Sequence, residues 1–560
     1  MVAPMPLSPQ PERLTSPPAA NRLRLEALLV GLVAALLFTL GIWNQAPQGF
    51  DGRWAVFLEE MFRHGPAFFP TTYGQPYPDY PATATWLSWL VARLIGAPNH
   101  LANVLPTALA SAGVLALTYR LLADTRRAWA LLAVLLVALT PQWLEKARAV
   151  CLDQMVALVV VLCFYLLHSA DRDGGPLRRL LVLPLFALGF AIRGPLGLIE
   201  PCGVVCLYWL VVAWGEPARR RFALQCLLGY GLAGLALLAL CWWTLIQLAQ
   251  YEGGADFAAE VWHMQVSGRL DESGKPFWFY LQLGLYRYLP VMPLALLLLA
   301  FQHRRLLSWP NLAERRLLLG LAGSGLLILI GLSIPHFKRA YYVVPMVPFL
   351  AALVAHGLLR ADGWFRRVVP VYTALVLALP ALALVALLVC RHLWQRHGYW
   401  PDVSLALWVP VFVALQIAAL VGWRRLAGSR RLLTLSALAL AAQWLMLVVV
   451  VEPAQDLQYD SRGFVQQVEG LRQQQPGPLV FFGLGQDSWA IRYIMNLDHD
   501  EHPLFVARPQ VADLAKLPAG AWVILARADR DLLEGTPLAN QQPVLERRLN
   551  GNPCLVYRLP

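Results

Sequence analysis

The composition of this 560-residue chain excludes an ordinary soluble protein. Hydrophobic residues make up 58% of the chain and charged residues only 14%, whereas soluble domains carry about 25% charged residues and single cores rarely exceed about 250–300 residues. The net charge of +12 does not indicate nucleic-acid binding, because the arginines lie in short clusters between apolar runs rather than on one basic face. We therefore expect a polytopic membrane protein that uses lipid as its solvent.

A proline-rich tail precedes the apolar runs. We expect residues 1–24 to be a disordered cytoplasmic tail and residues 25–451 to form a transmembrane domain of about thirteen helices. A span needs about 20 residues, and the runs that we expect to cross are approximately 25–43, 104–122, 128–143, 153–169, 178–192, 195–214, 222–250, 277–301, 316–334, 341–359, 368–390, 404–423 and 432–451, of which 178–192 is also short. A further run, 82–96, has 15 residues and contains Arg93, which favours a helix along the membrane surface.

The arginine clusters orient the runs. If 82–96 does not cross, every cluster falls on the cytoplasmic side, as the positive-inside rule requires. The clusters are Arg126-Arg127, Arg178-Arg179, Arg219-Arg220-Arg221, Arg304-Arg305, Arg366-Arg367, Arg424-Arg425 and Arg430-Arg431. Loops 44–103 and 251–276 then face the other side, with shorter connections at 144–152 and 335–340. This pattern predicts a bacterial inner-membrane protein whose polar loops are periplasmic.

Residues 452–560 have the polarity of a soluble domain. Apolar stretches such as 479–482 and 522–525 alternate with amphipathic stretches such as 461–472, which predicts alternating strands and helices. We expect a small periplasmic α/β domain attached to a mostly α membrane protein.

Two aspartates lie where a carboxylate could do chemistry. Asp51 follows the first span and could accept a proton from an acceptor, or cap the helix that follows. Asp153 opens an otherwise uncharged apolar run, where an ionisable group is costly and is a functional candidate. Its structural alternative is an ion pair with Arg148.

The loop Tyr73–Pro81 is rich in proline and tyrosine and suits a wall against which a sugar stacks, although an ordered connector has the same composition. Tyr77, Asp79 and Tyr80 are its candidate sugar or acceptor ligands. Asp79 and His263 could also hold a divalent metal, but two ligands from distant loops are a weak signal and lone histidines are mostly structural.

Several cations depart from the positive-inside pattern. They lie at the extracytoplasmic ends of the runs and are Arg193, Arg269, Lys275 and Lys338. Arginine and lysine both bind phosphate, so these cations could hold an anionic headgroup. The alternative is that they snorkel to phospholipid headgroups.

Six motifs carry a resemblance to a known family when taken in order. They are Asp51, Gly74-Gln75-Pro76-Tyr77-Pro78-Asp79-Tyr80-Pro81, Arg148 to Asp153, Arg193-Gly194-Pro195-Leu196-Gly197, Pro276-Phe277-Trp278-Phe279-Tyr280 and His336 to Pro345. The chain resembles the GT-C superfamily of membrane glycosyltransferases, in the branch of the ArnT-like lipid A aminoarabinose transferases and the protein O-mannosyltransferases. It departs from that pattern at Gly52, where a second acidic residue is usual, and at Tyr80, where a lysine is usual.

The resemblance implies a GT-C fold and transfer of a monosaccharide from a polyprenyl-phosphate donor to an acceptor on the periplasmic face. The catalytic carboxylates would be Asp51 and Asp153. The implied ligands of the donor phosphate are Arg193, Arg269, Lys338 and Arg148, and the implied sugar or acceptor ligands include Tyr341 and Tyr342 beside Tyr77, Asp79 and Tyr80.

The acceptor stays open at the level of sequence. Lipid A or a related envelope glycoconjugate is the first expectation, and a polysaccharide or a secreted protein such as a pilin is the alternative. A lipid-carrier flippase is the hypothesis from another class, but it would need polar residues near mid-span, whereas the charges here gather at one face. Membrane lipids are expected partners, and a divalent metal is a possible cofactor.

Overall fold

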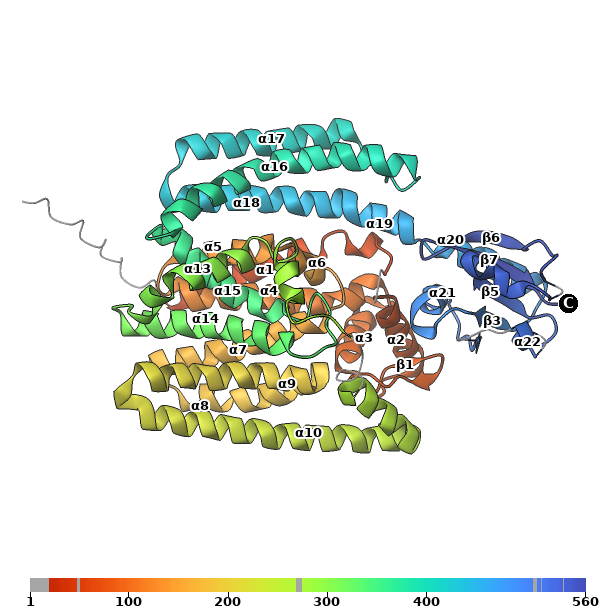
Figure 1. The fold of residues 1–560 in the computed structure, drawn as a ribbon, viewed down its shortest axis with the longest axis horizontal. Coiled ribbons are helices and arrows are strands. Elements are labelled where there is room, and N and C mark those ends of the chain that lie inside the picture. The colour runs from red at the N-terminus through yellow and green to blue at the C-terminus, as the bar shows by residue number, and fades with distance from the viewer. Residues whose placement is uncertain (1–19, 48–50, 268–273, 507–510, 515, 537) are drawn as a thin grey trace, which may run out of the picture.

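The computed structural model describes residues 20–47, 51–267, 274–506, 511–514, 516–536 and 538–560. The protein is mostly α-helical, as predicted, and its long helices run side by side along one axis (Figure 1). These helices are α1 (Ala20–Thr39), α4 (His100–Ala123), α5 (Arg127–Leu139), α7 (Leu152–Asp173), α9 (Val182–Gly215), α10 (Arg220–Trp262), α13 (Val291–Leu307), α14 (Leu312–Ser333), α15 (Val347–Arg360), α16 (Phe365–Arg396), α17 (Leu405–Arg425) and α18 (Gly428–Met446).

Within the described ranges, eight helical segments are long and apolar enough to cross a membrane, or nine if α5 and α6 (Pro141–Ala147), bent by 76°, count as one span. The eight are His100–Ala123, Leu152–Asp173, Pro176–Gly215, Pro217–Ser267, Leu312–Ser333, Phe365–Arg396, Leu405–Arg425 and Gly428–Gln474. The protein is therefore a multi-pass membrane protein. The count of about thirteen stays a prediction, because α1 carries charges near its start and α13 is 17 residues long.

One of these segments contains a reversal of the chain. The backbone of α9 leaves helical geometry at Arg193 and Gly194, where φ of Gly194 is +61°. A β-carbon on Gly189 would collide with the carbonyl of Gly197, and the reverse is also true. Residues eight apart in a continuous helix are about 12 Å apart, so the two halves must pack against each other as a hairpin. This reversal lies between the predicted runs 178–192 and 195–214.

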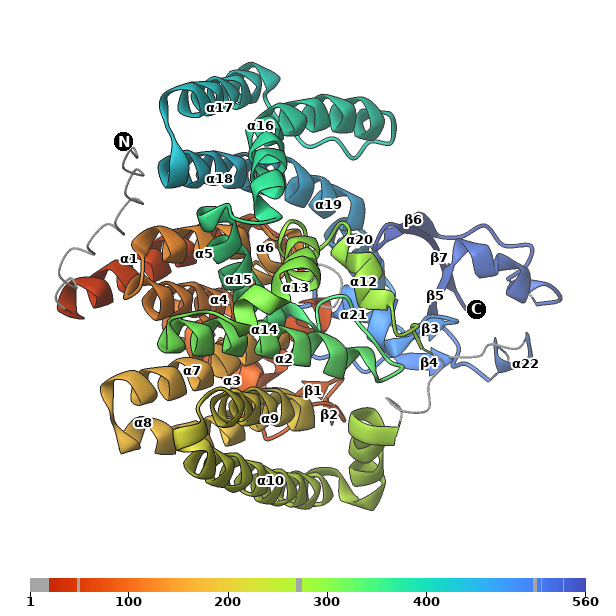
Figure 2. The same cartoon turned by 60° about the vertical axis from the view of Figure 1, so that its left-hand side comes forward.

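Short elements gather at one end of the bundle, beside the C-terminal domain (Figures 1 and 2). They are α2 (Asp51–His64), β1 (Thr71–Thr72), β2 (Gln75–Pro76), α3 (Thr83–Ile95), α6 and α12 (Phe279–Gly284). The predicted surface helix 82–96 corresponds to α3, which packs on α2 and α4. At 13 residues, α3 is too short for a span of about 20 residues.

The C-terminal domain is built on a mixed sheet of order β4-β3-β5-β7-β6, with β3 parallel to β4 and β5 and the other pairs antiparallel. Its strands are β3 (Leu479–Phe482), β4 (Leu504–Val506), β5 (Trp522–Ala526), β6 (Leu545–Leu549) and β7 (Asn552–Arg558), and its helices include α20 (Arg462–Gln474), α21 (Ile491–Ile494) and α22 (Val511–Leu514). The apolar runs of β3 and β5 are buried, as central strands covered on both faces require. The predicted small α/β domain is therefore present.

A single helical rod joins the two parts. Helix α18 continues through a π-helical turn, Leu447–Val451, into α19 (Glu452–Tyr459). The rod runs from the bundle to the C-terminal domain (Figure 1).

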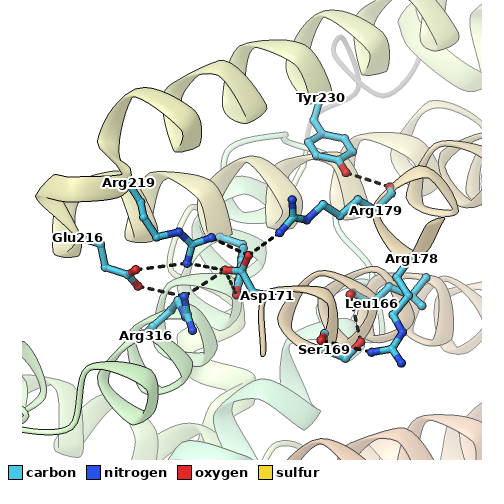
Figure 3. Close-up of polar contacts among 10 residues, drawn as sticks. Leu166, Ser169, Asp171, Arg178, Arg179, Glu216, Arg219, Tyr230 and Arg316 are labelled. Carbon is cyan, nitrogen blue, oxygen red and sulfur yellow. Dashed lines mark hydrogen bonds and ion pairs between the residues drawn. The ribbon is translucent and has the colours of Figure 1, made fainter. Parts of the chain in front are cut away.

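A buried ion cluster fastens four helices at the other end of the bundle. Asp171, at the end of α7, has no exposed side-chain surface and pairs with arginines from three segments (Figure 3). Arg179 comes from α8 (Pro176–Leu180), Arg219 precedes α10, and Arg316 lies on α14, with N–O distances of 3.1, 2.8 and 3.1 Å. Glu216 pairs with Arg219 and Arg316. Eighteen residues of helix, about 27 Å, separate this clamp from Asp153.

Candidate active site

A cavity of about 1320 Å³ lies where the short elements meet the bundle. Its lining has two chemical characters. One part carries ionisable and aromatic side chains from α2, α6, the start of α7 and the break in α9, and the other part is apolar and comes from α16 and α18. A cavity of this kind matches a ligand that has a charged head and a long apolar tail.

Asp51 lies at the first residue of α2 and lines the charged part of the cavity. Its side chain is 8% exposed, and its Oδ2 accepts a hydrogen bond from the backbone N–H of Val150 at 3.2 Å. Burial raises the pKa of Asp51 from 3.8 to about 6, although Lys146, the Val150 N–H and Arg492 oppose the rise. A carboxylate that titrates near neutral pH is suited to accept a proton from an acceptor.

Asp153 and Arg193 form a buried ion pair beside Asp51. Arg193 Nε lies 2.8 Å from Asp153 Oδ1, and the two side chains are 5% and 2% exposed. The break in α9 places Arg193 here, because the reversal aims its side chain at the start of α7. Arg193 Nη1 donates to the hydroxyl of Tyr80 at 3.1 Å, and its guanidinium lies 4.7 Å from the ring centre of Tyr342. Asp153 thus pairs with Arg193 rather than with Arg148.

Arg148 has another partner. Its Nε and Nη2 bind the two carboxylate oxygens of Glu452 at 2.6 and 2.7 Å, and its Nη1 donates to the carbonyl of Leu37 at 3.0 Å. A guanidinium has five N–H donors, and Arg148 uses those of Nε and Nη2 to bind the two carboxylate oxygens of Glu452. Gln45 also donates to Glu452. Arg148 therefore joins α1, the loop before α7 and the rod α18–α19.

The other predicted cations lie differently from one another. Lys338 is buried and donates from Nζ to the carbonyl of Lys275 at 2.9 Å, and it is not among the described residues that line the cavity. Arg269 lies outside the described residues, so its predicted role stays a prediction.

The predicted sugar and metal ligands line the same cavity. Tyr77, Tyr80, Tyr341 and Tyr342 present aromatic rings to it. Asp79 accepts a hydrogen bond from Gln265 at 3.2 Å, and His263 Nδ1 is 3.0 Å from the hydroxyl of Ser267. No group of three or more His, Cys, Asp or Glu side chains gathers at metal-binding distance in the described part of the chain, and a metal held by Asp79 and His263 stays a prediction.

Further charged residues reach the cavity that the sequence did not single out. Lys146 lines it from α6, pairs with Glu145 at 2.8 Å and lies 5.5 Å from the ring centre of Tyr341. Arg53 and Arg339 also line it. In the sequence, Lys146 lies in a short polar stretch after the apolar run 128–143. Such a stretch looks like an ordinary connecting loop, so the sequence did not mark Lys146 as a functional residue.

The apolar part of the cavity is a stripe along α16. Tyr372, Leu375, Val376, Leu379, Leu382, Ala383 and Ala386 line it. Their spacing of three and four residues keeps them on one face of a helix, and the stripe extends for about 21 Å. Gln443, Met446 and Leu447 of the rod face the same space. This groove is long enough to cover much of a hydrocarbon core about 30 Å thick.

Comparisons with known proteins agree with this arrangement. Residues 79–243 match the family model described as dolichyl-phosphate-mannose-protein mannosyltransferase. No curated protein matches the sequence. The structure is similar to ArnT from Cupriavidus metallidurans bound to undecaprenyl phosphate, with a TM-score of 0.66 and 16% identity over 96% of this chain and 98% of that one. The apo form of the same ArnT gives a TM-score of 0.68 and 17% identity over the same shares.

The fold and the cavity define a multi-pass membrane protein with the GT-C glycosyltransferase fold. Its fold is similar to that of ArnT over nearly the whole chain, and residues 79–243 match the model of the protein mannosyltransferases.

Proposed function

We propose that this protein transfers a monosaccharide from a polyprenyl-phosphate donor to an acceptor on the extracytoplasmic face of the membrane. The observation that carries the proposal is the continuity of the cavity, in which a charged chamber around Asp51, Asp153 and Arg193 opens into an apolar groove along α16. A polyprenyl-phosphate sugar has the same two characters, because its phosphate and sugar are polar and its prenyl chain is apolar.

The residues have separate roles in this reaction. Arg193 and Lys146 lie in the charged chamber and would neutralise the phosphate as it leaves the anomeric carbon, since fixed cations favour the charge that develops there. Asp51 would orient the acceptor nucleophile and accept its proton. Asp153 would hold Arg193 in place through their 2.8 Å ion pair.

The acceptor proposed first is lipid A or a related envelope glycoconjugate. The ArnT-like fold over nearly the whole chain supports this choice. Gly52 and Tyr80 differ from the residues that the lipid A transferases usually have, so the sugar need not be aminoarabinose. The C-terminal domain and the rod also reach the cavity through Asn550 and Gln455, which supports a part for them in binding the acceptor.

A transfer assay tests the proposal directly. The purified protein in liposomes is given polyprenyl-phosphate sugars and lipid A, and the product is read by mass spectrometry. We expect wild-type protein to form a glycosylated product, and Asp51→Asn and Asp153→Asn to reduce its formation by at least about 100-fold while membrane insertion is unchanged. Full activity in both variants would falsify the assignment.

The acceptor is identified by comparing a deletion strain with its parent. Lipid A and envelope glycoproteins from both are analysed by mass spectrometry, and we expect the loss of one sugar from lipid A. Loss of a sugar from a secreted protein instead would move the acceptor to the alternative class. Movement of the lipid carrier across liposomes without any glycosylated product would point to a flippase.

A further inference from the structure

The C-terminal domain contacts the first turn of α2 at Gly52. A β-carbon built on Gly52 would lie 3.2 Å from Ile491 Cγ2, 3.2 Å from Met495 Sδ and 3.5 Å from Arg492 Nε. A side chain at position 52 would therefore press on Ile491 and Met495, and these side chains would have to shift by a few tenths of an ångström. Glycine at this position lets the domain approach α2 directly beside Asp51.

The close packing of the C-terminal domain on α2 brings one charged residue, Arg492, next to Gly52. It is 2% exposed, and it donates a hydrogen bond to the carbonyl of Pro47, in the segment that leads to Asp51. Burial lowers the pKa of Arg492, and attraction to Asp51 and Tyr459 opposes this. A buried guanidinium is costly unless an anion compensates it, and Asp51 is the carboxylate that acts on it here.

The charges that face Asp51 come from three directions. From α6, Lys146 attracts the carboxylate of Asp51 and Glu145 repels it. The N–H of Val150, in the loop before α7, donates a hydrogen bond to it. Arg492 attracts it from α21 of the C-terminal domain. Glu145 is paired with Lys146, so the attraction of Lys146 for Asp51 is partly cancelled. Arg492 lies beside Gly52, the residue that follows Asp51, and its charge attracts the Asp51 carboxylate.

We infer that Arg492 is a positioning residue for Asp51, through which the C-terminal domain holds the carboxylate ionised and oriented for proton transfer. This inference rests on the proposed function, since it assigns Asp51 the role of base. It also gives the C-terminal domain a defined part in the reaction, because a domain that moved off Gly52 would remove the cation from Asp51.

The pH dependence of kcat/KM separates this role from a purely structural one. Removing Arg492 should raise the pKa of Asp51, because an opposite charge nearby favours the ionised form. In Arg492→Gln we expect the acidic limb of the profile to move up by about one pH unit, so that activity at pH 6 falls several-fold while activity at pH 8.5 is nearly retained. Arg492→Lys should keep the limb at its wild-type position.

Arg472 provides the matched control. It lies in the same domain and is held by Glu469 and Glu501 at 2.7 and 2.9 Å, and it is not among the charges that act most on Asp51. Arg472→Gln should lower the stability of the domain and leave the acidic limb unmoved. An unmoved limb in Arg492→Gln, or an equal shift in Arg472→Gln, would overturn the inference.

A double-mutant cycle gives a measurement that needs no enzyme assay. The unfolding temperatures of wild type, Asp51→Asn, Arg492→Gln and the double variant are measured in detergent at pH 8 and pH 5. We expect Arg492→Gln to lower the unfolding temperature more with Asp51 present than in the Asp51→Asn background at pH 8, and the difference to vanish at pH 5, where Asp51 is protonated. Additive effects at both pH values contradict the inference. Absence of product from wild-type protein counts against the proposed function alone, because the cycle still reports whether the two residues interact.

Discussion

Arg148 and Glu452 lie 304 positions apart in the chain and form a two-pronged ion pair at 2.6 and 2.7 Å, with only 1% of the Arg148 side chain exposed. The loop before α7 supplies the Val150 N–H that binds Asp51. The ion pair joins this loop to the rod α18–α19, which lines the apolar groove. Arg148 also lines the cavity, and its predicted role as a ligand of the donor phosphate stays a prediction.

This pair makes a prediction about stability. Removing one partner leaves a buried charge uncompensated, which costs about 3–5 kcal/mol, while replacing both by apolar residues is often nearly neutral. We therefore expect Arg148→Met and Glu452→Gln each to lower the unfolding temperature in detergent, and Arg148→Met with Glu452→Leu to recover most of the loss. If Arg148→Met folds normally and raises only KM for the donor, Arg148 binds the phosphate instead.

Asp51 should make the protein less stable as pH rises. Its pKa is about 6 in the folded protein against an ordinary 3.8, so the folded state binds the proton more tightly and stability is lost as pH rises from about 4 through 6. Replacing the carboxylate removes this cost, which is on the order of 2–3 kcal/mol. We expect Asp51→Asn to unfold at a higher temperature than wild type at pH 8 and at the same temperature at pH 4. A variant that is less stable than wild type at pH 8 would contradict the desolvation of Asp51.

The groove along α16 should determine the affinity for the lipid chain. Leu379→Trp adds volume inside the lining, and we expect it to raise KM for a long-chain polyprenyl donor about tenfold with little change for a short-chain donor, because only the long chain reaches that depth. Val385 is an exposed residue on the same helix that does not line the cavity, so Val385→Trp serves as the control. Equal effects on both donors would mean that the chain lies elsewhere.

The Asp171 clamp should contribute to stability without affecting substrate binding. Asp171→Asn removes the carboxylate shared by Arg179, Arg219 and Arg316, and we expect a loss of about 3–5 kcal/mol, seen as a lower unfolding temperature with KM unchanged in the folded fraction. Asp173, two residues on, has a side chain that is 40% exposed. Its replacement by Asn should change stability by less than about 1 kcal/mol, and an equal loss would show that burial is not the cause.

Much of the fold follows from patterns that the sequence displays. Apolar runs predicted most of the long helices, and a change of polarity at residue 452 predicted a separate sheet-containing domain. Asp51, Asp153, Arg193 and the tyrosines share one cavity, because they lie at the ends of runs or in the loop next to one, and the bundle brings the run ends on the same side of a membrane together.

The pairing of charges could not be predicted in the same way. Arg148 pairs with Glu452 and Gly52 packs against Arg492, and both contacts join the membrane domain to a domain that begins 300 or more positions later. Local periodicity carries no information on such contacts. Lys338 shows a related difficulty, because a cation at the end of a run can bind a carbonyl of its own chain, as Lys338 does with Lys275, as readily as a phosphate.

The hairpin in α9 has a consequence for how this protein can change in evolution. The backbone of Gly189 occupies the space that a β-carbon on Gly197 would need, and the backbone of Gly197 does the same for Gly189. Only glycine therefore fits at these two positions. Arg193 lies midway between them and owes its place to their approach. Two glycines, eight residues apart and flanking a solitary arginine in an apolar stretch, would therefore mark the same turn in chains whose remaining sequence has diverged beyond recognition.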